Sequence, residues 1–490
     1  MTASTPEPNR YAESRRRAYP GVALLFVLLA GLLWWMVLPG NPYPAAPVVG
    51  TFLSWLVLLA AVPLLRRVPR RRLGAVIIAG TVALGLIALS APPRTSNDSA
   101  RYAWDGIVQK AGISPYSHVP IDETLKELRP EWLFLPGSTT AGGTPVCSPG
   151  LFGTDSVAAY NFPSNEPLCT AINRPHVPTI YPPTAELYFF AVRAGVPDSV
   201  GYLPFQLAGL LLGAAVTVML LRLLARRGQP LQLAAVWGWS PFLQLEGVNN
   251  AHVDLLGGAL ILAAGMLIVG GRPLRSGVSF GAAVATKLIP VIAAPALLFH
   301  RPVRFIAAAS GTFVLLYVPY LAVAGAGVLG FLPGYLKEEG YSEREGIRFG
   351  LAQLVSNGQW PPVLSAAALA VVALAVLLRT GNDNVWDQQT VMIGLTLLIV
   401  SPNYPWYALM LLPFIVLSRR WEYVGIILAL DIIYMVPKEE PQAAMINQGV
   451  LLVAAAAVAA GAWLRRRREI RQTACSALAG DTLKNAPDSY

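Results

Sequence analysis

The sequence predicts an all-α membrane protein that crosses the bilayer many times. Hydrophobic residues make up 54% of the 490 residues and charged residues only 13%, about half the charged share of a typical soluble domain. The apolar residues gather in runs that approach or exceed the length a membrane helix needs. The net charge is +10, but Lys and Arg lie in short clusters between these runs, which is the positive-inside pattern and not a nucleic-acid surface.

The first part of the chain predicts three spans. Residues 1–20 are polar and basic, which places the N-terminus in the cytoplasm. Apolar runs at 21–38 and 46–65 form a hairpin that the basic stretch 66–72 returns to the cytoplasm, and a third run at 73–91 leads outside. Because the first run lacks a small-residue cleavage site, we expect it to be a retained helix and not a cleaved signal.

The second half of the chain holds the remaining runs. They lie at 199–224, 231–247, 254–270, 303–325, 362–379, 387–402, 405–418, 421–436 and 446–464. The stretch 276–300 is interrupted by Lys287 and Pro290. One crossing there would place Arg301 and Arg304 outside, so we prefer a broken hairpin with Lys287 near its outer tip.

This topology divides the chain into three parts. A transmembrane domain at 21–464, with about 12 to 14 membrane segments, is flanked by the cytoplasmic segment 1–20 and by a basic, disordered cytoplasmic tail at 465–490. We therefore expect the protein in the plasma membrane, with both termini in the cytoplasm.

Residues 92–198 contain no continuous span and form the expected extracytoplasmic region. Gly137 to Thr170 is rich in Gly, Ser, Thr and Pro, which predicts an irregular insertion. On an oxidising face, Cys147 and Cys169 could close a loop of about 22 residues, a link worth roughly 3 kcal/mol in the chain-entropy model. The alternative is two free thiols.

Unusual polar and aromatic residues gather at the outer ends of the expected spans. They are Asp98, Arg101, Trp104, Asp105, His176, Tyr181, Glu186, Glu246, His252, Asp254, Lys287, Asn403, Tyr404 and Trp406. Ionisable residues at such positions are costly to desolvate, so they are commonly kept for chemistry or for a charged ligand. We expect the segments that carry them to converge on one extracytoplasmic cavity.

Five short motifs occur in a characteristic order: RYAWDGIVQKAGISPY, PTIYPP, NAHVDLLG, TKLIP and SPNYPWY. With them, the chain resembles glycosyltransferase family 87 of the GT-C class of membrane glycosyltransferases, over roughly residues 94–415. The resemblance implies the GT-C fold, a lipid-linked sugar donor and inversion at the sugar. The family's actinobacterial relatives are polyprenyl-phosphate-mannose-dependent mannosyltransferases that build phosphatidylinositol mannosides and lipomannan in the cell envelope. We therefore expect transfer of mannose from polyprenyl phosphate to an extracytoplasmic glycolipid or lipoglycan.

An inverting transfer needs one carboxylate to take the proton from the acceptor hydroxyl. The resemblance implies that this base lies in the first outer loop, just beyond a membrane helix, which points to Asp98. Asp105 is the second choice. Both carboxylates could instead be structural, capping the loop helix or pairing with Arg101.

The leaving group is a lipid phosphate, and a cation can stabilise its developing charge. Lys287, with Arg101 or His252, suits this role; Lys287 could instead snorkel or pair with a carboxylate such as Glu246. His252 and Asp254 could bind the phosphate and the sugar hydroxyls, or Asp254 could be a plain helix cap. No cofactor and no metal is expected, because the spacing of His, Asp and Glu matches no recognised metal pattern.

Sugar contact is expected of Asp254, Glu246 and four aromatic residues, Trp104, Tyr181, Tyr404 and Trp406. Aromatic residues at this depth also serve as interface anchors. A transporter or flippase of a lipid-linked sugar is the alternative function, but it would place ionisable residues near the bilayer midplane. A catalytically dead glycan-binding protein is a third, against which the retained Asp98 and Lys287 argue.

Overall fold

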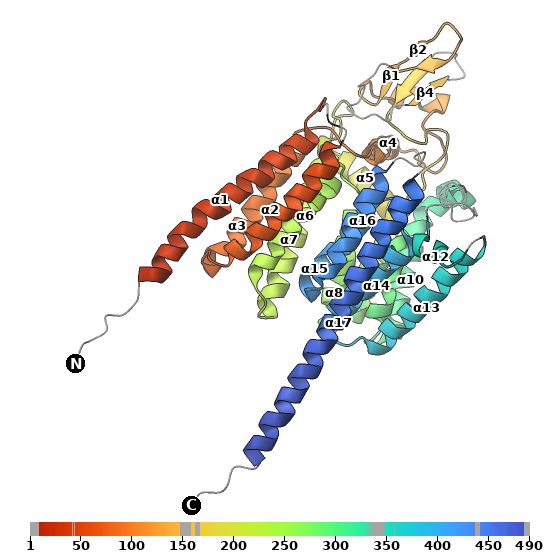
Figure 1. Ribbon diagram of the computed structural model, residues 1–490. Helices are drawn as coiled ribbons and strands as arrows, with labels where there is room; N and C mark the ends of the chain where they lie inside the picture. Colours follow the sequence, from red (N-terminus) through yellow and green to blue (C-terminus); the bar gives the residue numbers. More distant parts are fainter. Residues whose placement is uncertain are drawn as a thin grey trace, which may run out of the picture.

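The computed structural model is a bundle of helices with a small β region at one end (Figure 1). It describes residues 9–41, 43, 45–147, 158–161, 167–330, 332, 334, 348–356, 358–436 and 442–484. The start of α1 (Asn9–Val37) and the end of α17 (Ala443–Lys484) lie at the same end of the bundle, opposite the β region (Figure 1). The chain is a polytopic membrane protein, as expected.

Seven helices of the described chain are long and apolar enough to cross a membrane, or eight if one bent pair counts as a span. They are α1 over Tyr19–Val37, α2 (Ala46–Leu65), α3 (Arg70–Ala88), α6 (Leu203–Arg226), α10 with its 3-10 extension (Pro302–Leu329), α13 (Trp360–Arg379) and α17 over Ala443–Ile470. The bent pair is the π-helix η4 (Leu243–Asn249) with α8 (Asp254–Val269), at 110° to one another.

The remaining apolar runs fold into shorter pieces, which is why this count is below the expected 12 to 14. They are η3 (Leu231–Leu233), α7 (Ala234–Gly238), α9 (Pro273–Val284), η5 (Ile289–Leu297), α12 (Gly350–Gln353), α14 (Val385–Val400), η7 (Pro405–Met410), α15 (Leu412–Ser418), η8 (Trp421–Tyr423) and α16 (Val424–Met435). Proline accounts for part of the fragmentation, since it cannot donate the backbone hydrogen bond that continues a helix.

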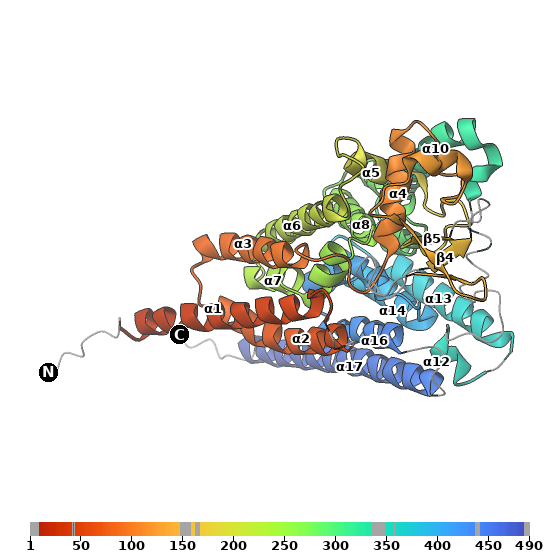
Figure 2. The ribbon, with the colours of Figure 1, turned by 90° about the horizontal axis from the view of Figure 1, so that it is seen from above.

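Several of these short pieces form the centre of the bundle. All six residues of α15 from Leu412 to Leu417 are buried, as expected for a helix that is apolar on every side. The helices α10 and α13 are mostly exposed, with 11% and 17% of their most apolar windows buried. Seen from above, α1 and α2 lie at one edge of the bundle and α10 at the opposite edge (Figure 2). The exposed apolar faces are therefore the surfaces that suit contact with lipid.

The stretch expected as a broken hairpin does reverse direction twice. Ser276 and Ser279 of α9 donate hydrogen bonds to the carbonyls of Ala264 and Leu260, so α8 and α9 are antiparallel. Gly277 and Gly281 face the backbone of Phe305 and Ala309 in turn, so α9 and α10 run parallel. The segment η5 between them must therefore return along the bundle. Lys287 lies at the turn before η5, which is the hairpin tip that the sequence favoured.

The region between α3 and α6 folds outside the candidate spans. It contains α4 (Asp98–Lys110), a 3-10 turn (Glu123–Leu128), five short strands and α5 (Pro183–Arg193): β1 (Phe134–Pro136), β2 (Ser138–Thr139), β3 (Pro145–Val146), β4 (Ala158–Asn161) and β5 (Pro167–Thr170). The central strand β5 is antiparallel to β1, with Leu135 opposite Cys169, and to β4. Strands β2 and β3 form a second antiparallel pair.

These strands correct the prediction of an irregular insertion at 137–170, whose residues 148–157 and 162–166 lie outside the described chain. Gly and Pro mark the turns, and the short strands between them are held by backbone pairing. Cys147 and Cys169 are joined by a disulfide with their Cα atoms 5.8 Å apart, which is the pairing favoured from the sequence.

The C-terminal segment also differs from expectation. A disordered tail was predicted from residue 465, but α17 continues to Lys484, and residues 485–490 lie outside the described chain. A run of Arg, Glu, Gln, Ala and Leu favours helix, and the preceding apolar turns supply a nucleus from which it extends.

Candidate active site

One cavity of about 260 Å³ lies at the end of the bundle where α4 begins. Four stretches and Tyr434 of α16 supply most of its wall. The lining residues are Ser96, Asn97, Asp98, Arg101, Asn173, Arg174, Val177, Pro178, Ile180, Tyr181, Pro182, Lys287, Leu288, Ile289, Leu332, Tyr404, Trp406, Tyr407 and Tyr434. Four of the five segments expected to converge thus supply lining residues, whereas the segment that carries Glu246, His252 and Asp254 supplies none.

Asp98 is the first residue of α4 and lies on the cavity wall. Its backbone N–H donates to Oγ of Ser96 at 3.2 Å, and Nδ2 of Asn173 lies 3.4 Å from its Oδ1. Oδ2 lies 3.5 Å from Nδ1 of His252, and 16% of the Asp98 side chain is exposed. Burial raises the pKa of the Asp98 carboxyl, but the His252 and Lys287 side chains outweigh it and hold that pKa below its ordinary range. Asp98 is therefore an ionised carboxylate facing the cavity.

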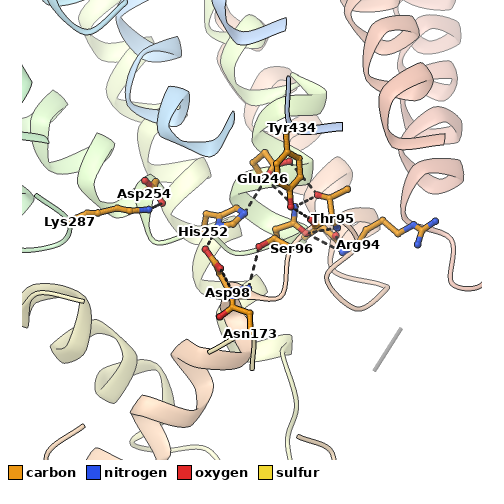
Figure 3. Close-up of polar contacts among 12 residues, drawn as sticks. Arg94, Thr95, Ser96, Asp98, Asn173, Glu246, His252, Asp254, Lys287 and Tyr434 are labelled. Carbon is orange, nitrogen blue, oxygen red and sulfur yellow. Dashed lines mark hydrogen bonds and ion pairs between the residues drawn. The ribbon is translucent and has the colours of Figure 1, made fainter. Parts of the chain in front are cut away.

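His252 is fully buried behind the cavity wall, between two carboxylates (Figure 3). Its Nε2 lies 3.2 Å from Oε2 of Glu246. Glu246 also accepts from Nδ2 of Asn250 at 3.1 Å. The ring of Trp406 stacks on the imidazole with 3.9 Å between centroids. Asp98, His252 and Glu246 thus form a row that leads from the cavity into the protein.

The backbone beside this row is irregular. The π-helix η4 carries Glu246, and Ala251 follows it with a positive φ of 56° immediately before His252. Asn249 of η4 donates from its Nδ2 to the carbonyls of Ala88 and Pro92, at the end of α3, at 2.8 and 3.1 Å. The stretch that precedes Asp98 is therefore tied directly to the helix break that carries His252.

Lys287 also lines the cavity and is paired with a buried carboxylate. Its Nζ lies 3.0 Å from Oδ2 of Asp254 and 4.3 Å from the ring centroid of Tyr407. Asp254 is the first residue of α8, and its side chain is 1% exposed against 18% for Lys287. The pairing expected as an alternative exists, but its carboxylate is Asp254 and not Glu246. The ammonium still lies at the cavity surface.

Arg101 and Asp105 are held together on one face of α4. Nε of Arg101 donates to both oxygens of Asp105 at 2.9 and 3.0 Å, and Nη1 donates to the carbonyls of Arg174 and Val177. Asp105 is 1% exposed and does not line the cavity. This position fits a structural role for Asp105, as the partner of Arg101, and does not fit the role of general base.

Behind Asp105 lies Glu186 of α5, whose carboxyl accepts from Thr179 Oγ1 at 2.6 Å and from Gln109 Nε2 at 2.9 Å. Burial and the neighbouring Asp105 carboxylate raise the pKa of Glu186 far above its ordinary range. Two fully buried carboxyls beside one guanidinium are best accommodated with Glu186 protonated, because the second negative charge would be unbalanced.

The predicted aromatic contacts divide into two groups. Tyr181, Tyr404 and Trp406 line the cavity, and the rings of the last two stack 4.7 Å apart. Trp104 does not line it: the indole is 1% exposed and packs edge-on against Phe134 in a separate buried cluster. A sugar in the cavity cannot reach Trp104, so that expectation is corrected. His176 is exposed and also lies off the cavity wall.

Asn173, Arg174, Tyr407 and Tyr434 are among the cavity residues that sequence reasoning missed. Asn173 and Arg174 follow the disulfide-bonded strand β5 and directly precede the motif that holds Tyr181, so their place in the sequence was a usable signal. Tyr407 and Tyr434 lie within apolar runs, where they resemble interface anchors. Among the described residues, no group of three His, Cys, Asp or Glu side chains could hold a metal ion.

Residues 179–402 match the sequence model of Glycosyltransferase family 87. This segment includes Tyr181, Glu246, His252, Asp254 and Lys287, whereas Asp98 lies before it and Trp406 after it. Neither a curated protein nor a solved structure matches the chain. The chain is thus a polytopic membrane protein in which residues 179–402 match Glycosyltransferase family 87.

Proposed function

We propose that this enzyme transfers mannose from a polyprenyl-phosphate donor to an extracytoplasmic glycolipid or lipoglycan, with inversion at the sugar and Asp98 as general base. The observation that carries the proposal is that the carboxyl of Asp98 and the ammonium of Lys287 line the same cavity of about 260 Å³. A base and a phosphate-binding cation on one cavity are the two groups that this reaction needs.

In the proposed reaction, the acceptor hydroxyl gives its proton to the Asp98 carboxylate as its oxygen bonds to the anomeric carbon. The bond from that carbon to the phosphate oxygen breaks, and its electron pair leaves with the polyprenyl phosphate. Lys287 stabilises the developing charge on that phosphate. Attack from the face opposite the leaving group inverts the anomeric centre.

The neighbouring side chains support these two roles. His252 lies 3.5 Å from Asp98 and orients its carboxylate, while Glu246 holds the imidazole from the other side. Arg101 is proposed as a second cation for the phosphate; its Nη2 is buried and has no hydrogen-bond acceptor among the described residues. The rings of Tyr181, Tyr404 and Trp406 offer apolar faces to the sugar.

We also propose that the cavity faces the extracytoplasmic side and that both termini are cytoplasmic. The described ends of the chain lie at the end of the bundle opposite α4, the helix that begins at Asp98 (Figure 1), and the basic residues Arg465 to Arg468 belong to the last helix, α17. Basic clusters of this kind favour the cytoplasmic face. The domain limits proposed are those expected from the sequence, with the catalytic domain at 21–464.

The test is sugar transfer from radiolabelled polyprenyl-phosphate-mannose to endogenous lipid acceptors in membranes that contain the native chain or Asp98→Asn. Loss of a positioned base is expected to lower the rate by roughly 10² to 10⁴. Asp383→Asn is the matched control, because Asp383 is an exposed carboxylate in the turn between α13 and α14, away from the cavity.

The outcomes separate the parts of the proposal. Full activity of a normally inserted Asp98→Asn variant would refute the assigned base. Transfer only from a polyprenyl phosphate carrying another sugar would refute mannose, and no transfer from any such donor would refute the lipid-linked donor itself.

A further inference from the structure

A second hollow lies far from the active-site cavity, beside the basic part of α17. Its volume is about 470 Å³, and its lining residues are Arg379, Arg420, Ala462, Arg465, Arg466 and Glu469. These residues come from the end of α13, the turn between α15 and η8, and α17. We call this hollow the arginine pocket. Three separate parts of the chain thus bring four guanidinium groups to one place.

Carboxylates balance only part of this charge. Nε of Arg420 lies 3.0 Å from Oδ1 of Asp387, and Arg465 pairs with Glu422. Nη2 of Arg465 is buried and finds no hydrogen-bond acceptor in the described chain. Glu469 also lines the arginine pocket, so three carboxylates balance four guanidinium groups. The arginine pocket therefore holds an excess of positive charge and of N–H donors.

Aromatic residues indicate the depth of the arginine pocket in the membrane. The apolar part of α17 ends at Leu464, immediately before Arg465. Trp463 and Trp421 are 52% and 38% exposed, and the guanidinium of Arg467 lies 3.6 Å from the ring centroid of Trp463. Exposed Trp beside Arg at the end of an apolar helix is typical of the level of the lipid headgroups.

We propose that the arginine pocket binds the phosphate of an anionic phospholipid headgroup. A planar guanidinium donates two parallel N–H bonds to a phosphate, so two or more of them from different elements can enclose one phosphate group. Basic hollows between membrane helices are suited to anionic headgroups. The bound lipid would link α13 to α17 at the end of the bundle opposite the active site.

The experiment uses the purified full-length protein in neutral detergent and measures the thermal unfolding midpoint while phosphatidylglycerol is added. The variant Arg379→Gln/Arg466→Gln removes two of the four guanidinium groups that line the arginine pocket. Arg467→Gln/Arg468→Gln is the matched control, since it removes two charges from the same α17 without altering a lining residue. We expect the lipid concentration that gives half of the stabilisation to rise about tenfold in the pocket variant and to stay unchanged in the control.

Three results would overturn the proposal. An equal rise of the half-stabilising lipid concentration in both variants would show a general attraction of the basic surface for anionic lipid. Equal stabilisation by phosphatidylcholine would show that the anionic headgroup is not recognised. Equal stabilisation by glycerol phosphate or inorganic phosphate at the same concentration would show a site for soluble phosphate instead. A third variant, Arg379→Lys/Arg466→Lys, keeps the charge without the forked donors and is expected to bind with intermediate affinity.

Discussion

Lys287→Met would separate two roles that the structure combines in one side chain. The substitution keeps an unbranched stem but removes the ammonium that lies 3.0 Å from Oδ2 of Asp254. Asp254 is 3% exposed, and its other oxygen, Oδ1, has no hydrogen-bond partner in the described chain. Removing one partner of a buried ion pair leaves an uncompensated charge, at a cost of roughly 3 to 5 kcal/mol.

The same substitution should also slow the reaction. A preorganised cation that stabilises the leaving phosphate is worth a factor of about 10² to 10³ in rate. Lys287→Met alone should therefore lose both stability and activity. In Lys287→Met/Asp254→Asn, the buried charge is gone as well, and most of the stability should return while the activity remains low.

The measurements are the thermal unfolding midpoint in lipid-detergent micelles and the transfer rate per folded molecule. Asp254→Asn alone is the control for loss of the carboxylate, because it retains the ammonium at the cavity. If the double variant transferred sugar at the rate of Asp254→Asn, Lys287 would be only the counter-ion of Asp254, and its role toward phosphate would be refuted.

Three further predictions concern the surroundings of the site. The pKa of Glu186 is raised in the folded protein, so its protonated carboxyl stabilises the fold fully below about 4.3, the pKa of an unfolded glutamate, and this contribution is lost as pH rises toward the folded pKa. The unfolding midpoint of the native chain should therefore fall relative to that of Glu186→Gln between pH 5 and 8. An opposite trend would contradict a protonated Glu186. Trp406→Leu should lower kcat/KM on the order of tenfold through loss of aromatic contact with the sugar. The core substitution Trp104→Leu should lower the unfolding midpoint and leave KM unchanged. Equal effects of the two substitutions on KM would contradict the assignment of Trp406 to the cavity and Trp104 to the core. Joint replacement of Cys147 and Cys169 by Ser should lower stability by about 2 to 4 kcal/mol and speed proteolysis at 137–170, and unchanged proteolysis would count against a constraining role.

The sequence predicts where the apolar runs and the polar motifs lie. It predicts less well whether an apolar run folds as one long helix or as several short ones. The run at 276–300 could be resolved into a hairpin because Lys287, Arg301 and Arg304 constrain its topology. No such charge marks the run at 405–418, which folds as η7 followed by α15. A short apolar helix and part of a long one have the same local composition, so tertiary packing decides between them.

The error at Trp104 has a local cause. Ala100, Trp104 and Val108 are spaced by four residues and share one buried cluster, whereas Asp98, Arg101 and Asp105 lie on another face of α4. This spacing predicts an apolar helical face, which the residue types of the motif alone do not distinguish from the face that lines the cavity. Tyr434 offered no comparable signal, since its neighbours are apolar on both sides.

The position of Asp98 depends on buried polar contacts more than on apolar packing. Between α3 and α4 the chain has no regular structure, so its backbone groups need partners from elsewhere. The side chain of Asn249 binds the carbonyls of Ala88 and Pro92, and that of Asn250 accepts from the N–H groups of Arg94 and Thr95. Both asparagines adjoin the helix break that carries His252. The positions of Asp98 and of the His252 imidazole therefore depend on the same hydrogen bonds. Replacing either asparagine should displace both side chains together, whereas loss of an apolar contact of similar size should not.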